Sequence, residues 1–510
     1  ILKYESEGLG SSGSGFPDDQ VLTNLNSAAK KNSISSSYSS NTLASFLSRL
    51  EYKFDNRYLL TLNFRADGSS QFGPDKRWGY FPSGAVAWII TEENFMKDYS
   101  NIVSYLKLRG SVGKTGSQNL GAYDWRTLMG SATYNGAAGI VPSSLGNDIL
   151  QWEEQIQKEV GLDYGFWDDR IRGTLGYYQK KVDNLLYSDP VPTSSSFSSV
   201  YQNIGSLKNR GIEFDVRVDI IKNAPKDLTW NVDFNIARNR TTLEKLNSSD
   251  GYFGGGAYDY FKIEEGGETG RFYGYKDAGR LFMTNEELVG LKTIDPKTGT
   301  LKYYRDDYNY ERQGDVYIMD LDGDGQITAD GDRTVIGNAN PDFFGGFGST
   351  LYWKGLMLNA VFSYSVGGDR FWDEEKNSSG DMNVYNTSNR ILDSWTVNPG
   401  VNASYPRAMY YGWGSNSIIT DRYIHDASYL RMTALNLSYR LPKHLYKNSI
   451  LNAVEFTFQA TNLFTWTKYP GMDPQGNFST TYSAFYNMGI DYSTYPSART
   501  YNFGIKLTLK

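Results

Sequence analysis

Strict alternation of apolar and polar residues constrains this chain more than any other feature of its sequence. Near the C-terminal end, Tyr501, Phe503, Ile505, Leu507 and Leu509 alternate with polar or small residues. A period of two is typical of a β-strand that has one face in an apolar environment and the other in a polar one. In other segments, charged residues fill the second face so thoroughly that a dry core on that side is excluded. The second face must therefore be wet.

The same alternation predicts about thirteen strands, each near the ~9–11 residues that a tilted strand needs to cross a bilayer. An all-β fold, a transmembrane antiparallel β-barrel, is the class that this pattern favours. A soluble series of β-sandwiches or a propeller is the alternative, because both also contain many short strands. The predicted strands cover residues 43–54, 57–66, 83–91, 103–113, 153–166, 170–180, 211–221, 228–239, 344–353, 356–366, 429–440, 451–462 and 500–510.

The connections between these strands alternate in length. Short ones lie at 55–56, 92–102, 167–169, 222–227, 354–355 and 441–450, and long ones at 67–82, 114–152, 181–210, 240–343, 367–428 and 463–499. Outer-membrane barrels have short periplasmic turns and long extracellular loops. We therefore expect the long connections outside the cell, residues 1–42 in an external loop, and the end of the last strand on the periplasmic side.

Composition narrows the classes of function. The chain has 510 residues, a mean hydropathy of −0.51 and no apolar run near the ~18 residues that a spanning helix requires. The absence of Cys excludes a disulfide scaffold, a Cys-ligated metal site and a thiol nucleophile. The net charge of −6 comes without a long basic block, so nucleic acid is not expected as a partner.

The start of the chain indicates a piece of something larger. It begins Ile1-Leu2, with neither an initiator Met nor a signal peptide. An odd number of strands does not suit a bacterial single-chain barrel, and an open edge in lipid is costly. We therefore expect an odd number of further strands upstream, with residues 1–510 forming the C-terminal part of the barrel.

Several long motifs carry a family resemblance. Residues 58–73 read YLLTLNFRADGSSQFG and are followed by RWGYFPS at 77–83. Matches continue in order at 106–116, 161–165, 203–205, 208–213, 332–342, 429–432, 462–465 and 495–500. In these motifs the chain resembles the SusC/RagA-type TonB-dependent outer-membrane transporters of Bacteroidetes.

The resemblance implies a barrel of about 22 strands in the outer membrane, in contact with lipid. It implies an N-terminal plug and a TonB-contacting segment, neither of which has a counterpart in these residues. It also implies a SusD-like surface lipoprotein as a lid, and import of oligosaccharides, the products of glycan breakdown, or of oligopeptides. Energy would arrive through TonB. The long connections 240–343 and 367–428 are the expected contact with the lid.

An Asp-rich loop predicts a structural divalent cation, Ca²⁺ above all. If Asp320 is position one of the loop, carboxylates occupy positions one, three and five and Gly325 occupies position six, as in EF-hand calcium loops. Position twelve is Gly331, where a bidentate acid is expected, so closure would need a shifted loop. A metal-free loop rich in Asx turns is the alternative. The candidate ligands are Asp320, Asp322, Asp324, Gln326, Asp330 and Asp332.

Aromatic residues make up 15% of the chain and fall into two groups. Those on strands, such as Phe64, Trp230 and Phe456, are expected to face lipid. Those in the long connections are candidates for stacking on sugar rings or for holding peptides. The candidate substrate contacts are Tyr252, Phe253, Tyr258, Tyr260, Tyr273, Tyr275, Phe371, Trp372, Tyr410, Tyr411 and Trp413.

Other functions are less well supported by the residues. A Ser-His-Asp hydrolase would have to use His425 or His444, and no G-x-S-x-G motif accompanies them, so we do not expect an enzyme. We expect His425 to be an exposed histidine at the outer rim of the barrel. A passive porin or adhesin barrel is the alternative to an active importer. In either case, the residues expected on the wet side of the wall are Arg49, Glu51, Lys53, Arg65, Asp215, Arg217 and Asp233.

Overall fold

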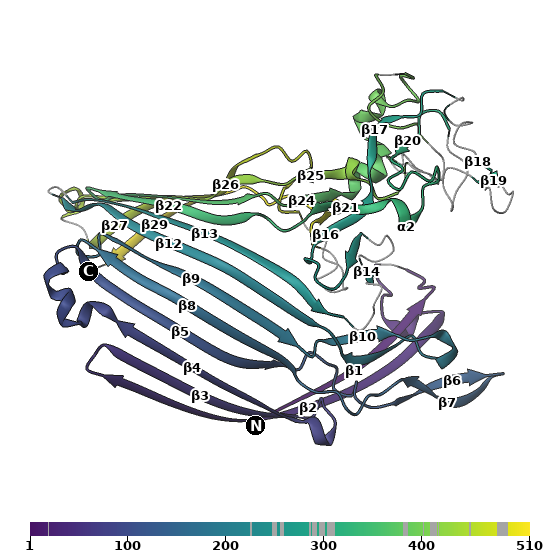
Figure 1. Ribbon diagram of the computed structural model, residues 1–510, viewed down its shortest axis with the longest axis horizontal. Helices are drawn as coiled ribbons and strands as arrows, with labels where there is room; N and C mark the ends of the chain where they lie inside the picture. Colours follow the sequence, from purple (N-terminus) through teal and green to yellow (C-terminus); the bar gives the residue numbers. More distant parts are fainter. Residues whose placement is uncertain are drawn as a thin grey trace.

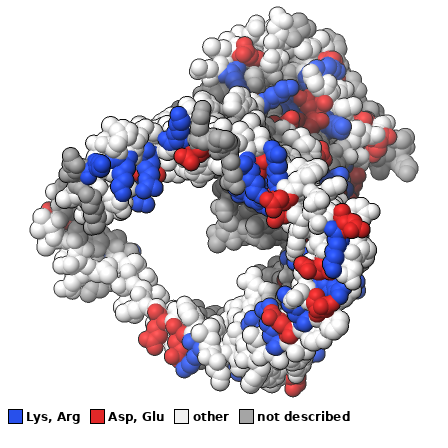
Figure 2. Space-filling model, turned by 90° about the vertical axis from the view of Figure 1, so that its left-hand side faces the viewer, with Lys and Arg blue, Asp and Glu red and all other residues white. Residues whose placement is uncertain are grey.

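One antiparallel sheet of fourteen strands forms the body of the molecule and curves around a central opening (Figure 1 and Figure 2). Each strand pairs with its neighbours in chain order, and β1 and β29 are the two edges of the described sheet. The computed structural model describes the whole chain except residues 19, 225–226, 247–251, 255–259, 285–286, 288–292, 295–300, 303–311, 381–385, 401, 409–415, 417, 448–449, 477–487 and 510.

All thirteen predicted strands are confirmed, most of them with longer bounds. Three of them, β8, β23 and β26, have the predicted ends. The strands of the sheet are β1 (Leu2–Ser14), β2 (Lys30–Phe54), β3 (Tyr58–Ser69), β4 (Trp78–Ile89), β5 (Val103–Ser117), β8 (Glu153–Phe166), β9 (Ile171–Asp183), β12 (Ser206–Ala224), β13 (Leu228–Lys245), β22 (Phe343–Trp353), β23 (Leu356–Val366), β26 (Tyr429–Arg440), β27 (Leu451–Thr467) and β29 (Thr500–Leu509).

The prediction that residues 1–42 form an external loop is wrong. Strand β1 pairs with the first half of β2, in a register that places Gly8 opposite Ser37 and Gly10 opposite Ser35. Ser and Gly indicate turns by composition, but here the small residues of one strand lie against those of the next. Fourteen is an even number, so the expectation of an odd number of strands upstream loses its basis.

Short and long connections lie at opposite ends of the sheet, as the sequence predicts (Figure 1). Five of the six predicted long connections are shorter in the structure, because the strands continue beyond the alternating segments. They span 70–77, 118–152, 184–205, 246–342 and 468–499. The residues added to β3 and β13 are mostly polar, whereas β4 gains Trp78, Tyr80 and Phe81.

The two faces of the sheet differ as the alternation requires. On β29 the five alternating apolar side chains are 56–81% exposed and cover the outer face. Lys and Arg lie beside Asp and Glu along the wall that faces the opening (Figure 2). On that wall Arg217 of β12 stands opposite Asp233 of β13 in the register. Among the described residues, no helix is both long and apolar enough to cross a membrane.

The long connections carry their own small sheets and short helices. The strands are β6 (Leu128–Tyr134), β7 (Ala137–Ser144), β10 (Leu186–Pro190), β11 (Ser199–Asn203), β14 (Tyr252–Gly254), β15 (Phe261–Ile263), β16 (Arg271–Tyr275), β17 (Asp277–Leu281), β18 (Thr293–Ile294), β19 (Leu301–Lys302), β20 (Val316–Ile318), β21 (Arg333–Asn338), β24 (Asp369–Trp372), β25 (Ile424–Asp426) and β28 (Ile490–Asp491). The α-helices are α2 (Ala329–Asp332) and α3 (Asp373–Glu375), followed by a π-helical turn at Lys376–Gly380. Single turns of 3₁₀-helix lie at Leu25–Ser27, Pro74–Lys76, Ile90–Glu92, Thr193–Ser195, Asn389–Asp393, Asp421–Tyr423 and Lys443–Tyr446, and a longer one at Asn94–Tyr99.

Candidate functional site

Three long connections, 246–342, 367–428 and 468–499, fold together at one end of the sheet, and we call them the loop domain. Strand β24 of the second connection pairs antiparallel with β25 and parallel with β28 of the third. Phe272, Phe371 and Ile490, one from each connection, belong to the same buried apolar cluster. This shared core joins the three connections into one folded unit above the end of the sheet (Figure 1).

Three of the predicted substrate aromatics belong to the interior of the loop domain. Tyr260 is buried and its hydroxyl donates to Asp373 Oδ1 at 2.6 Å. Phe371 is fully buried in edge contact with Tyr260, and Trp372 is buried beside Tyr469. A stacking platform must present a ring face to the ligand. In this structure these three rings pack the core and do not present that face.

The other predicted aromatics divide between half-buried and undescribed positions. Tyr273 is half-buried, with the ammonium of Lys262 5.1 Å and the guanidinium of Arg333 5.0 Å from its ring centroid. Tyr275 packs against the cluster of Leu281 and Phe282. The side chains of Tyr252 and Phe253, and residues Tyr258, Tyr410, Tyr411 and Trp413, lie outside what the structure describes.

The Asp-rich loop brings together three of its predicted ligands. Carboxylate oxygens of Asp320, Asp322 and Asp324 lie within 4.8 Å of one another at the surface. Asp320 also accepts hydrogen bonds from the backbone N–H groups of Gly323 at 2.7 Å and Gly325 at 2.8 Å. The loop is therefore shaped by Asx turns, and its hard, clustered oxygens fit the chemistry of Ca²⁺.

The other predicted ligands are not among the three clustered carboxylates. Asp332 is fully buried, and its two oxygens accept from the N–H groups of Leu321 at 2.6 Å and Thr328 at 2.7 Å. These two hydrogen bonds hold the ends of the loop together. Asp330 and Gln326 are not part of the described carboxylate cluster.

His425 belongs to a network centred on the buried Glu375. Its Nε2 lies 2.5 Å from Glu375 Oε2. Arg390 and the hydroxyl of Tyr405 donate to the other carboxylate oxygen at 2.5 and 3.2 Å. The side chain of His425 is 26% exposed. The prediction of an exposed histidine at the rim is therefore wrong, because this imidazole helps to hold β25 against α3.

A second ion pair fixes the connection 246–342 to the connection 367–428. Asp315 is buried, lies 2.7 Å from Arg407 Nε and accepts from Asn416 Nδ2 at 2.8 Å. Burial raises the pKa of Asp315 above its ordinary value, and the facing Arg407 opposes that rise. The contacts of Asp315 with Arg407 and Asn416 hold the two connections together, which is a structural role.

Where the loop domain meets the ends of β22, β23 and β26, the structure has a hollow of about 450 Å³, which we call the mouth hollow. Its lining includes Ser363, Arg370, Tyr429 and Gln475. Sequence reasoning missed all four. Arg370 directly precedes Phe371 and Trp372, both predicted as substrate contacts. The alternation of residues along β24 does not by itself show which of its faces is turned toward the large sheet, so Arg370 was not predicted.

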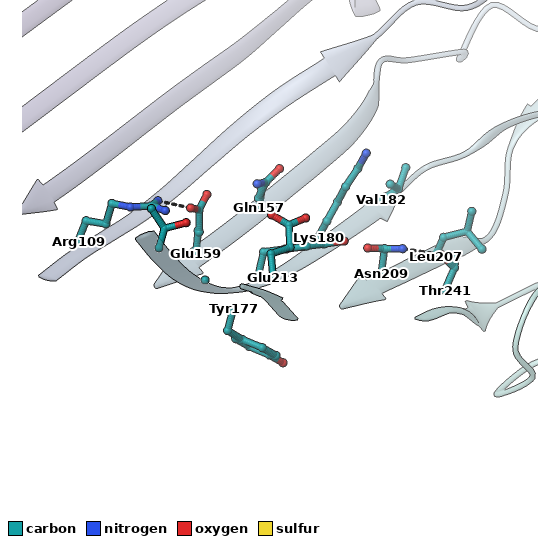
Figure 3. Close-up of a pocket in the computed structure, with 13 residues that line it drawn as sticks. Arg109, Gln157, Glu159, Tyr177, Lys180, Val182, Leu207, Asn209, Glu213 and Thr241 are labelled. Carbon is teal, nitrogen blue, oxygen red and sulfur yellow. Dashed lines mark hydrogen bonds and ion pairs between the residues drawn. The ribbon is translucent and has the colours of Figure 1, made fainter. Parts of the chain in front are cut away.

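A second hollow of about 510 Å³ lies along the charged wall of the opening (Figure 3). Arg109 of β5 bonds there to Glu159 of β8, and its Nε lies 3.1 Å from Asp163 Oδ1. Asn209 donates to Thr241 Oγ1 at 2.6 Å, while Tyr177 points away to the other side of the sheet. Paired charges of both signs make this wall strongly polar.

Comparison with known proteins gives consistent matches. A family model described as TonB dependent receptor-like, beta-barrel matches residues 4–413. TonB-dependent receptor P3 of Formosa agariphila is 32% identical over 99% of this chain and 49% of its own length. TonB-dependent receptor SusC of Bacteroides thetaiotaomicron is 32% identical over 92% of this chain and 44% of its own length.

A solved structure described as the RagAB peptide transporter superimposes with a TM-score of 0.78 at 27% identity. The match covers 99% of this chain and 52% of that one. The chain therefore spans about half the length of the relatives that it matches.

Proposed function

Because the chain belongs to the TonB-dependent receptor-like β-barrel family, we propose that it acts in TonB-dependent active import into the cell. It is a SusC-like outer-membrane protein. The observation that carries the proposal is the superposition of 99% of the chain on a transporter of this kind. The polar wall in Figure 3 supports it, because charged and amide side chains line the side of the sheet that a hydrophilic solute would pass.

The proposed cargo is a short hydrophilic oligomer. Oligosaccharides follow from the resemblance to SusC-type transporters. Oligopeptides are the second candidate, favoured by the structural match to a protein described as a peptide transporter. The burial of Tyr260, Phe371 and Trp372 removes three aromatics from the candidate substrate contacts, which applies to sugars and to peptides alike.

We assign the contact with a SusD-like surface lipoprotein to the loop domain. The three connections that form it share one apolar core, so they present a preformed surface at the end where the long connections gather. TonB would supply the energy through the whole protein, of which this chain is about half. Ca²⁺ bound by Asp320, Asp322 and Asp324 would be a structural cation of this surface.

Uptake by whole cells tests the import proposal. We expect deletion of the gene to abolish uptake of one labelled pool, either oligosaccharides or oligopeptides, and a protonophore to have the same effect on the parent strain. The pool that loses uptake identifies the cargo class. Uptake that persists with a protonophore but is lost on deletion would instead indicate a passive porin. If the protein purified from native membranes carried no lipoprotein, the proposed contact with a SusD-like lid would be contradicted.

A further inference from the structure

Arg370 is a half-buried cation that has no carboxylate partner among the described residues. Its Nε is buried and has no hydrogen-bond partner, and the hydrogen bond recorded for its Nη1 is to the backbone oxygen of Asp369 at 3.2 Å. No carboxylate of the described residues lies within 4.0 Å of its guanidinium nitrogens. A buried charge without a partner is costly to keep in a folded protein.

Four other described arginines have a similarly buried Nε. Three of them pair with a carboxylate: Arg57 with Glu93 at 2.6 Å, Arg407 with Asp315 at 2.7 Å, and Arg422 with Asp277 at 2.7 Å. The fourth, Arg333, donates to the backbone oxygen of Tyr273 at 3.1 Å and lies over the Tyr273 ring. Arg370 therefore differs from the three arginines that pair with a carboxylate, and unlike Arg333 it lines the mouth hollow.

The two carboxylates that attract Arg370 from farther away are engaged elsewhere. Asp369 accepts from the N–H of Asn338 at 2.8 Å. Asp491 accepts from the hydroxyl of Tyr469 at 2.7 Å and from the N–H of Thr494 at 3.2 Å. Burial lowers the pKa of Arg370, and the nearby acids oppose that shift without reversing it. The Nε donor of Arg370 therefore has no acceptor among the described residues and is available to another one.

The mouth hollow offers further donors beside Arg370. Ser363 Oγ is buried without a hydrogen-bond partner. The hydroxyl of Tyr429 accepts from Gln475 Nε2 at 2.5 Å, which leaves its own hydrogen to donate. Arg431 is close in sequence to Tyr429 but is fully engaged, with Thr465, Gln475 and Asp473 as acceptors. The lining thus combines one unpaired cation with two hydroxyl donors.

We propose that the mouth hollow binds a carboxylate group of the imported oligomer, with Arg370 as its ion-pair partner and Ser363 and Tyr429 as hydrogen-bond donors. A planar guanidinium matches a carboxylate in a bidentate pair, and a hollow of about 450 Å³ accommodates one end of an oligomer. The carboxylate has two sources, the C-terminus of a peptide or a uronic acid residue of a glycan. The proposal rests on the import function proposed above.

Binding to the purified native complex tests the site. The probes are two matched pairs: oligopeptides with free or amidated C-termini, and oligogalacturonates with free or methyl-esterified carboxyls. We expect the free acid of one pair to bind at least about tenfold more tightly than its neutral form. The pair that shows the preference identifies the source of the carboxylate. Equal affinity within both pairs, or no binding of any acidic probe, overturns the proposal.

Two variants separate the site from a general charge effect. Arg370→Met should remove the preference for the acid, and Arg370→Lys should retain part of it. Arg240→Met is the matched control, because Arg240 donates to the backbone of Pro341 in the same lining but pairs with Asp342 at 3.0 Å. It should keep the preference. An acid preference that survives in Arg370→Met contradicts the proposal.

Thermal stability gives a second readout that does not depend on the probes. Replacing a half-buried charge that has no ion-pair partner with an apolar side chain of similar length is expected to leave the melting temperature of the complex unchanged or to raise it. A marked fall in Arg370→Met would reveal a structural partner for Arg370 and overturn the assignment. Failure of whole-cell uptake, by contrast, would count against import alone, because the binding assay does not require transport.

Discussion

Arg431 and Asp473 show how a single buried ion pair fixes a connection to the end of a strand. Both side chains are buried, with Arg431 Nη2 2.6 Å from Asp473 Oδ1. Burial alone would raise the pKa of Asp473, but hydrogen bonds from Arg431 and from the N–H groups of Gln475 and Ser497 hold it below its ordinary value. The ionised form is therefore the one that the folded state stabilises.

A pH dependence follows from this lowered pKa. The stability contributed by Asp473 is present above its unfolded value of about 3.8 and is lost as pH falls through the lower folded value. We expect Asp473→Asn to lower stability at pH 7 by about 3–5 kcal/mol, because Arg431 loses its counter-charge. The loss should shrink near pH 3. Thermal melting of the detergent-solubilised complex at both pH values checks this, and an equal loss at both would contradict it.

The Asp-rich loop supports a prediction about cation binding. We expect Asp322→Asn to weaken Ca²⁺ binding about tenfold or more, because the charge of the clustered ligands sets the affinity of such sites. Asp330→Asn is the control, since Asp330 lies outside the described cluster, and it should have little effect. Calorimetric titration of the purified protein with Ca²⁺ measures both. Equal affinity of Asp322→Asn and the parent would count against a metal site.

Single residues were predictable from the sequence where the motif itself dictates geometry. The spacing of Asp320, Asp322 and Asp324 was sufficient, because a tight turn places alternate side chains together. Phe371 and Trp372 were not predictable as core residues, since their burial depends on two other connections folding over them. Arg370 was not predictable as a lining residue of the mouth hollow either, because that hollow forms only where several connections meet the ends of the strands.

At the scale of elements, alternation located strands only where the two faces of the sheet differ in chemistry. The apolar outer face made β8, β23 and β26 predictable to the residue. Other strands continue beyond the alternating region in mostly polar residues, so β2 and β12 were predicted too short. Small sheets of the loop domain escaped prediction because their strands are too short to show a period.

The wall itself gives a prediction about which face meets lipid. Ile505 on β29 is 66% exposed on the outer face, whereas Asn502 stands on the opposite, inward face. We expect Ile505→Arg to destabilise the folded wall by up to about 2–4 kcal/mol, the range for an arginine near the bilayer midplane. Asn502→Arg should be tolerated. Folding yield into lipid vesicles measures both, and equal tolerance would contradict the assigned faces.

At the scale of the whole molecule, the two ends of the sheet differ in structure. The loop domain gathers at one end, and turns such as 354–355 lie at the other (Figure 1). From this asymmetry we expect the long connections to lie outside the cell, as in other outer-membrane barrels. A substrate arriving from outside would meet the loop domain and the mouth hollow before the polar wall shown in Figure 3.

Because residues 1–510 contain no Cys, a single thiol introduced among them can report this direction, with labelling of the parent protein as the background. Ser131 is exposed in the β6–β7 hairpin at the end of the long connections, and Ser100 is exposed between β4 and β5 at the opposite end. We expect a bulky maleimide that does not cross the outer membrane to label Ser131→Cys in intact cells. Ser100→Cys should react only after permeabilisation, because its connection faces the periplasm. The reverse labelling pattern would show that the sheet has the opposite orientation in the membrane. An imported oligomer would then meet the charged wall of Figure 3 before Arg370.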